Sequence, residues 1–249
     1  MGRYVYGLRP VLEALRARPE EVEQLYVGQG EGELPARQAG EVFSRARAAG
    51  LKVQRLPRER LGALAEGGVH QGVVAQLREF RYSELDELLE VAHARGQPPL
   101  IVVLDGIQDP HNLGAIVRSA NALGAHGVVI ARDRAAQVTG AVAKAASGAT
   151  EHTRLARVTN LSRALEALQK AGLWVAAADP SADQVVWDAR LDGPLALVVG
   201  AEGSGVRENV LRHCDHRVRI PMTGEMPSLN ASVSAAVLLY EVARQRARR

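Results

Sequence analysis

Cysteine, lysine and aromatic residues are scarce in this chain of 249 residues. Cys214 is the single cysteine, so an intramolecular disulfide is impossible and a cytoplasmic location is expected. No apolar run approaches the ~20 residues that a membrane-spanning helix needs. Residues 1–21 have neither the apolar stretch nor the small-residue cleavage site of a signal peptide, so none is expected. These absences, with that of internal repeats, argue against disulfide-rich, membrane-embedded and repeat proteins.

Composition and charge place the chain among ordinary globular proteins. Hydrophobic residues make up 47% and charged residues 24%, which excludes a disordered or fibrous chain. The formal net charge of +3 permits a polyanionic partner without requiring one. All but three of the 31 basic residues are arginine, whose planar guanidinium suits phosphate binding and base stacking. Codon usage or thermal adaptation explains this bias more simply than an arginine-specific function.

The pattern along the chain predicts two domains joined by a linker. Residues 1–77 alternate between short helical and strand patterns, which is typical of a small α/β domain. Within it we expect helices over 4–20, 33–50 and 57–65, and strands over 24–27, 51–55 and 72–77. Residues 78–98 hold a helix that opens with a capping box, Ser83 and Asp86, and we interpret them as the linker.

Residues 99–249 predict an α/β domain with a mainly parallel sheet. Their strands are continuous apolar runs, as expected for strands buried on both faces. Helical patterns alternate with these runs, which places helices on both faces of the sheet. The expected strands are 100–104, 127–131, 173–178, 195–199 and 217–220, and the expected helices are 113–123, 139–147, 160–171, 206–213 and 231–247.

A first polar loop, within residues 104–118, joins a buried strand to a helix. Asn112 is a natural N-cap for that helix, while Gly114, Arg118 and Asn121 share one of its faces. Backbone N–H groups at a helix N-terminus with an arginine one turn in outline an anion site. An ordinary strand-to-helix turn with a solvated arginine is the simpler interpretation of this loop taken alone.

A second loop, residues 198–206, carries three glycines between a buried strand and a helix. Such a loop lets a ligand approach the backbone closely. The glycine order is G-x-x-G-x-G, and no Walker lysine occurs, so hydride transfer and P-loop chemistry are disfavoured. Glu202 stands among the glycines and would repel phosphate. We expect a ligand that carries positive charge or hydroxyl groups.

A third loop, residues 220–232, contains two prolines and two methionines. Asn230 is the expected N-cap of the closing helix, and Ser228 and Ser232 supply further short polar groups. The methionines are interpreted as packing residues. All three loops follow predicted parallel strands, and open α/β sheets bind ligands at the carboxyl ends of their strands. Together they predict a bound cofactor.

The three loops resemble, in order and spacing, the three motifs of the SpoU/TrmH branch of the SPOUT RNA methyltransferases. D-P-H-N-L-G-A-I-x-R-S-A resembles the first motif, V-V-G-A-E-G-S-G the second and I-P-M-x-G-x-M-x-S-L-N-A-S-V-S the third. The likeness spans residues 100–240 and no motif residue departs from it. Residues 6–15 and 70–73 are similar to one subgroup, the RlmB-like ribosomal RNA guanosine-2′-O-methyltransferases.

The resemblance implies a fold, a cofactor and partners. The larger domain should thread a deep trefoil knot, which general chain-topology rules disfavour. S-adenosylmethionine should bind in the knot loops, at positions matching Gly200, Ile220, Met222 and Leu229. The family acts as a homodimer on RNA, with both sites near the subunit interface. The small first domain is similar to ribosomal-protein-like RNA-binding modules.

The implied reaction is attack of a ribose 2′-oxygen on the sulfonium methyl group. The family assigns catalysis to the arginine matching Arg118, often described as the base. Because a guanidinium stays protonated in proteins, we expect Arg118 to anchor phosphate and stabilise the alkoxide. Proton removal then falls to water or a neighbour such as Glu202. Asn112, Ser228 and Asn230 should orient the ribose, and no metal is required.

Other features of the sequence have simpler interpretations, and some alternative functions stay open. Residues 213–216 contain two histidines and a cysteine, but they are contiguous and lack the spaced pairs of zinc sites. Trp174 and Trp187 are interpreted as packing residues, and the basic tail 244–249 as a solvated helix end with RNA contact as an alternative. Transfer RNA methylation, antibiotic-resistance methylation of ribosomal RNA and non-catalytic RNA binding remain as alternative functions. The target nucleotide is not specified.

Two expectations concern the domains as separate parts. Segment 99–249 should bind S-adenosylmethionine by itself, because all three loops lie in it. Residues 1–80 should recruit RNA through phosphate contacts, whose counterion release makes affinity depend steeply on salt. The arginines expected to make these contacts include Arg3, Arg9, Arg16 and Arg18.

Overall fold

The structure is a computed structural model that describes residues 3–29, 34 and 36–248. It divides into two compact units, residues 1–81 with 137–152, and residues 82–136 with 153–249. The start of the expected helix at Glu33 and the last residue of the basic tail, Arg249, lie outside the described residues. None of the helices in the described part of the chain has the length and apolar character that a membrane span requires.

The first unit is a four-stranded sheet in the order β1-β4-β2-β3, antiparallel except for the parallel pair β2 and β3. Side chains from α1, α2 and α6 pack on one face around Val5 and Leu25, and α3 packs on the other around Leu61. Its elements are β1 (Arg3–Tyr6), α1 (Leu8–Ala17), η1 (Pro19–Glu21), β2 (Val22–Gly28), α2 (Ala36–Ala48), β3 (Val53–Leu56), α3 (Arg58–Leu64), β4 (Val73–Leu77), α6 (Gly140–Ala145) and η2 (Ala149–Glu151).

The expected helix over 4–20 is wrong in its first turn. Residues 3–6 form β1, in which burial alternates between buried and half-buried positions as in a strand covered on one face. Gly7 follows with a φ of 92°, a conformation that glycine adopts at little cost. This residue separates the strand from α1, which begins at Leu8.

A segment from the middle of the sequence completes the first unit. Residues 137–152 belong to it, and Ala143 is fully buried in its core. The Arg3 guanidinium donates to the Glu151 carboxylate at 2.8 Å and lies over the Phe80 ring, 4.9 Å from its centroid. Arg3 is therefore buried in an ion pair and is not the exposed phosphate contact that the sequence predicted. The expected domains, residues 1–77 and 99–249, place segment 137–152 in the second domain, whereas the structure places it in the first unit.

Deleting residues 1–81 is expected to destabilise segment 137–152. The deletion removes the partner of the buried Glu151 carboxylate and uncovers Ala143, so a charge and an apolar surface lose their burial. Limited proteolysis with mass spectrometry should show rapid cleavage within 137–152 in the truncated protein and protection in the full chain. Equal protection in both would contradict the assignment of this segment to the first unit.

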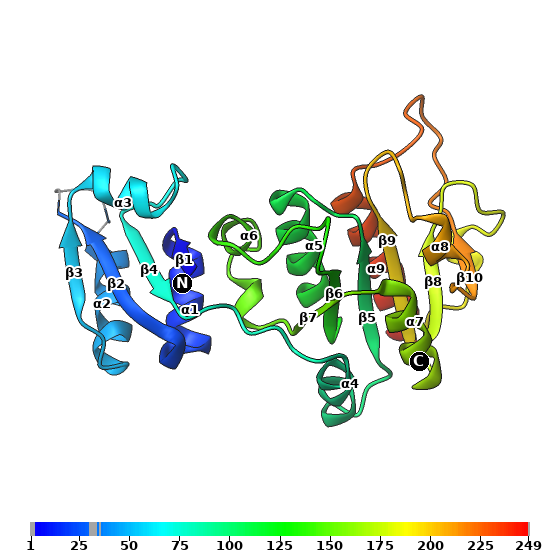
Figure 1. Ribbon diagram of the computed structural model, residues 1–249, viewed down its shortest axis with the longest axis horizontal. Helices are drawn as coiled ribbons and strands as arrows, with labels where there is room; N and C mark the ends of the chain where they lie inside the picture. Colours follow the sequence, from blue (N-terminus) through cyan, green and yellow to red (C-terminus); the bar gives the residue numbers. More distant parts are fainter. Residues whose placement is uncertain (1–2, 30–33, 35, 249) are drawn as a thin grey trace. The chain divides into compact units, whose positions relative to one another are not determined.

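The second unit is a six-stranded sheet in the order β10-β8-β9-β5-β6-β7, and all of its strand pairs are parallel (Figure 1). The predicted parallel α/β sheet is confirmed. Its elements are α4 (Leu85–Ala94), β5 (Leu100–Asp105), α5 (Pro110–Ala122), β6 (Gly127–Ala131), β7 (Leu155–Val158), α7 (Leu161–Lys170), β8 (Trp174–Ala178), η3 (Val186–Asp188), β9 (Leu195–Gly200), α8 (Glu208–Leu211), β10 (His216–Val218) and α9 (Ala231–Arg246).

Helices cover both faces of this sheet. Side chains of α4, α7 and α8 share a core with Ile101 and Val103 of β5. Because strand side chains alternate between faces, Val102 and Leu104 face the other side, where α5 and α9 pack against each other. Edge strand β7 was not predicted, since exposed Arg157 interrupts its short apolar pattern.

The interpretation of residues 78–98 as a linker is wrong for most of its length. From residue 82 onward the chain belongs to the second unit, and Leu88 of α4 is fully buried in its core. The predicted capping box is also wrong, because the N-cap of α4 is Glu84 and no side chain caps it. Ser83 instead extends the sheet, with its backbone N–H donating to the Leu155 carbonyl at 2.8 Å.

Acid is expected to weaken the second unit through His126. This side chain is 2% exposed, and its Nδ1 accepts the Leu100 N–H at 3.0 Å. Burial, aided by the charges of Arg95 and Arg246, lowers the pKa of His126 from 6.5 to about 4. The unfolded chain therefore binds a proton first, so stability from this group is complete above pH 6.5 and declines as the pH falls to about 4.

Denaturant unfolding at pH 7 and pH 4.5 tests this prediction. His126→Asn keeps an acceptor at the Nδ1 position but has no titrating group. The loss of unfolding free energy between the two pH values should be smaller in this variant than in the wild type. Equal losses would contradict a role for His126.

Candidate functional site

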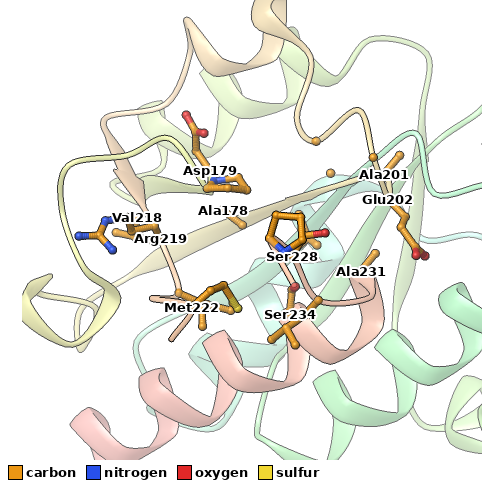
Figure 2. A pocket seen from close by; sticks show the side chains of 18 residues that line it. Ala178, Asp179, Ala201, Glu202, Val218, Arg219, Met222, Ser228, Ala231 and Ser234 are labelled. Atoms are coloured by element: carbon orange, nitrogen blue, oxygen red, sulfur yellow. The ribbon is translucent and has the colours of Figure 1, made fainter. Parts of the chain in front are cut away.

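A pocket of about 740 Å³ opens at the carboxyl ends of β8, β9 and β10, against the first turn of α9 (Figure 2). The four residues predicted to bind a cofactor all line it, as do two of the predicted catalytic residues. The first four are Gly200, Ile220, Met222 and Leu229, and the other two are Glu202 and Ser228.

The glycine loop after β9 closes on itself as a tight hairpin. Ala201 and Gly205 exchange backbone hydrogen bonds, N–H to C=O, at 3.1 and 2.9 Å. A Cβ on Gly200 would lie 2.0 Å from the Gly205 carbonyl carbon, closer than any packing allows. The sequence predicted these glycines as room for a ligand. The structure shows that Gly200 is also required for the hairpin itself.

An ion pair between a buried carboxylate and a half-exposed arginine holds the base of this hairpin. Asp105 ends β5 beside Gly200 in the sheet register, and its side chain is fully buried. Its carboxylate accepts the Arg207 backbone N–H and the Arg207 Nε–H, both at 2.8 Å. Hydrogen bonding to this carboxylate raises the pKa of Arg207. The pair ties the end of β5 to the residue that follows the loop.

The pair of Asp105 and Arg207 was not predicted from the sequence. A signal was present, because an aspartate ended an otherwise apolar strand at 100–105 and buried charges require a partner. The partner could not be identified from spacing, since 102 positions separate the two residues.

Asn230 joins the second and third loops. Its Oδ1 accepts the Ser232 N–H at 2.9 Å, which confirms the predicted N-cap of α9. Its Nδ2 donates to Glu202 Oε2 at 3.0 Å. This bond holds the Glu202 carboxylate at the pocket edge with its other oxygen, Oε1, able to accept a further donor. Two of the three predicted catalytic residues on these loops, Glu202 and Asn230, are therefore brought together.

Arg118 and Asn112 lie outside the pocket lining. Arg118 is exposed on α5, the helix that packs against α9. The predicted N-cap at Asn112 is wrong: α5 begins at Pro110, and the Asp109 carboxylate caps it by accepting the His111 N–H at 2.9 Å. A proline at the first helical position fixes the start of the helix there. Asn112 consequently lies within the first turn.

The chemistry of the pocket fits S-adenosylmethionine. Its apolar wall, which includes Val199, Ile220 and Leu229, can cover an adenine ring. Glu202 places a carboxylate at its edge, where it can accept ribose hydroxyls or face an ammonium and a sulfonium. Asp179 also lines the pocket, but its Oδ1 already accepts the Ser181 N–H and hydroxyl at 2.9 and 2.7 Å. The Glu202 carboxylate matches the ligand with positive charge or hydroxyl groups that was predicted from the second loop.

The side chains of residues 213–216 contact different neighbours in the structure. Burial raises the pKa of Cys214 to about 12, and its thiol lies 3.4 Å from the Val210 carbonyl. His216 instead lies against the Trp174 ring. No group of three or more possible ligands gathers anywhere in the described residues. Trp174 and Trp187, expected to be packing residues, are each more than half exposed.

Known proteins resemble the chain over its whole length. The SpoU rRNA Methylase family model matches residues 99–240, and a model of RNA 2′-O ribose methyltransferase substrate binding matches residues 4–83. The 23S rRNA (guanosine-2′-O-)-methyltransferase RlmB of Yersinia pestis is 41% identical over 99% of this chain and 98% of its own. RlmB of Escherichia coli is 37% identical over 99% and 100%.

Solved structures show the same relationship. The SpoU methyltransferase AviRb from Streptomyces viridochromogenes, in complex with the cofactor AdoMet, is 28% identical and aligns with a TM-score of 0.79 over 99% of this chain and 91% of its own. The A. aeolicus TrmH/SpoU tRNA modifying enzyme is 30% identical, with a TM-score of 0.56 over 66% of this chain and 81% of its own. The site, the fold and these matches agree that the chain belongs to the SpoU rRNA methylase family of RNA 2′-O-methyltransferases.

Proposed function

We propose that this protein transfers a methyl group from S-adenosylmethionine to the ribose 2′-oxygen of a guanosine in 23S ribosomal RNA. The observation that carries the proposal is the pocket itself. The second and third motif loops line it, and the hydrogen bond between Asn230 and Glu202 joins these loops. Full-length similarity to RlmB proteins supports the choice of substrate. The cytoplasm, where ribosomal RNA is modified in bacteria, is the proposed location.

The residues of the chain would position the reactants and stabilise charge. When bound, S-adenosylmethionine supplies an electrophilic methyl group. Gly200, Ile220, Met222 and Leu229 would hold it in the pocket, and Ser228 would face the incoming ribose. Positioning the 2′-oxygen in line with the methyl group removes much of the entropic barrier.

Arg118 would stabilise the developing alkoxide and anchor the target phosphate. A guanidinium remains protonated at physiological pH, so it serves as an electrostatic group and not as a base. Glu202, whose carboxylate Asn230 orients, is the proposed proton acceptor, directly or through water. Asn112, in the first turn of the same helix as Arg118, would contact the RNA beside it.

We propose a homodimer formed through α9. Its exposed face carries Val233, Val237 and Tyr240, which are spaced by four and three residues and share one side of the helix. Contiguous exposed apolar residues mark interaction surfaces. Tyr240→Asp should convert a dimer, measured by light scattering after size exclusion, into a monomer. A wild-type protein that elutes as a monomer would contradict the proposal.

Ribosomal RNA is favoured over transfer RNA as the substrate because relatives that act on the two RNAs cover different shares of this chain. The tRNA modifying enzyme aligns with only 66% of this chain, whereas the RlmB proteins cover nearly all of it, including the first unit. The first unit matches a substrate-binding model, and we propose that it recruits the RNA. The trefoil knot remains a prediction from the family.

Mapping the methylated nucleotide tests the function. Purified full-length protein is incubated with unmodified 23S rRNA or transfer RNA transcripts and S-adenosylmethionine, and 2′-O-methyl groups are located by reverse transcription at low nucleotide concentration. A single guanosine in 23S rRNA is the expected target. Methylation of transfer RNA alone, or of neither RNA, would contradict the proposal.

A further inference from the structure

A second hollow lies in the first unit, apart from the cofactor pocket. It encloses about 1270 Å³ of space open to solvent, between α3 and the loop that leads to β4. Four glycines line it and leave backbone where side chains would otherwise fill the space. The remaining lining residues are Arg58, Glu59, Val69, His70 and Gln71.

The loop over this hollow, residues 66–72, has a strained backbone. Glu66 and Gln71 adopt φ values of 51° and 52°, a left-handed conformation that is unfavourable for residues other than glycine. Gly67 and Gly72 also have positive φ values. Such strain persists only where the surrounding structure fixes the backbone, and it gathers at ligand clamps.

Several contacts fix the ends of the loop. Gln71 Oε1 accepts the Leu8 N–H and the Lys144 ammonium, each at 3.1 Å. The Gly68 backbone lies so close to the Tyr6 ring that an added Cβ would stand 2.4 Å from it. The two sequence stretches that resembled the RlmB-like subgroup, 6–15 and 70–73, thus meet to build this one loop.

The anchored loop presents groups suited to a nucleotide. Val69 is 72% exposed, although it is held in place by residues fixed on both sides. His70 Nδ1 accepts the Gly72 N–H at 3.1 Å, so the neutral ring carries its proton on Nε2, as a donor. Arg58 supplies a guanidinium at the rim, beside the Glu59 carboxylate, which can accept from an amino group or a hydroxyl.

We propose that this hollow binds an unpaired nucleotide of the RNA substrate. This nucleotide is not the one that is methylated. The base would lie on the glycine backbone and Val69, and Arg58 would contact the adjoining phosphate. An RNA occupant is favoured over a protein because the hollow combines glycine backbone with an arginine and an imidazole, groups that suit a phosphate and a base. The inference rests on the proposed RNA substrate and names where the first unit holds it.

Two variants at exposed positions test the proposal in the full-length protein. Val69→Glu adds a negative charge beside the base, and Arg58→Ala removes the phosphate contact. Matched controls on α2, which packs on the opposite face of the sheet, are Gln38→Glu and Arg47→Ala, both exposed. Binding to an unmodified 23S rRNA transcript is measured across a salt series, with S-adenosylmethionine affinity as the folding control.

Val69→Glu is expected to weaken RNA binding about tenfold, because an apolar contact with the base is replaced by a carboxylate that repels the adjoining phosphate. Arg58→Ala should lower the slope of log affinity against log salt by about one, as expected for one lost phosphate contact. Neither variant should change S-adenosylmethionine affinity, and 4-thiouridine in the transcript should crosslink to residues 66–72. Variants that bind the RNA as the controls do would overturn the proposal.

Two further outcomes separate this inference from the proposed function. Normal binding to naked RNA with reduced methylation of assembled particles would overturn it in favour of a protein occupant. Specific RNA binding that depends on Val69, without methylation of 23S rRNA, would support this site while contradicting the proposed reaction.

Discussion

Replacing Arg118 with alanine is expected to reduce methyl transfer by at least about 10²–10³-fold, the usual cost of removing a donor that stabilises developing negative charge. S-adenosylmethionine affinity should stay within a few-fold of wild type, because Arg118 lies on α5 and not among the residues that line the pocket. Single-turnover methylation and calorimetric titration measure the two effects. Arg163→Ala, an exposed arginine on α7, is the matched control.

Arg118→Lys separates the charge from the geometry of the guanidinium. Lysine keeps a positive charge but cannot copy the planar, two-pronged donor pattern that suits phosphate. We expect the lysine variant to be severely impaired as well. Near-normal turnover would show that charge alone is sufficient at this position.

Asp105→Ala is expected to lower the free energy of unfolding by about 2–3 kcal/mol, somewhat below the cost of breaking a fully buried pair, because Arg207 is half exposed. It should also weaken S-adenosylmethionine binding by tenfold or more. The reason is that the Asp105 carboxylate holds Arg207, and with it the hairpin that forms one wall of the pocket. Asp105→Asn keeps the shape but places an amide against the guanidinium, so an intermediate loss is expected.

Asp215→Asn controls for a general loss of stability. This carboxylate accepts the Val175 N–H at 2.8 Å, at the opposite end of the sheet from the pocket. The variant should unfold more easily yet bind S-adenosylmethionine as the wild type does. If Asp105→Ala also bound the cofactor normally, the positioning role of the ion pair would be refuted.

Local sequence patterns determined the parallel sheet and the cofactor side of the site. Strands β5, β6 and β9 are continuous apolar runs because both of their faces are covered, and this pattern is visible without a structure. The polar, glycine-rich loops at the carboxyl ends of these strands could also be recognised, because each loop interrupts an apolar run. The loops that carry Gly200, Glu202 and Asn230 were identified in this way, whereas the roles of these residues toward the cofactor and the RNA came from the resemblance to the SpoU/TrmH branch.

Only the tertiary structure decided the features that depend on residues far apart in the chain. The pairs of Asp105 with Arg207 and of Arg3 with Glu151 span 102 and 148 positions, and no periodicity links their members. Segment 137–152 has helical and turn patterns that fit either unit, and its burial against β1 assigns it to the first. The sequence by itself determined which elements form and where polar groups interrupt them. The tertiary structure decided which distant charges neutralise one another and which unit a short segment completes. The physical reason is burial, because a charge or an apolar face is stable only beside the partner that the fold supplies.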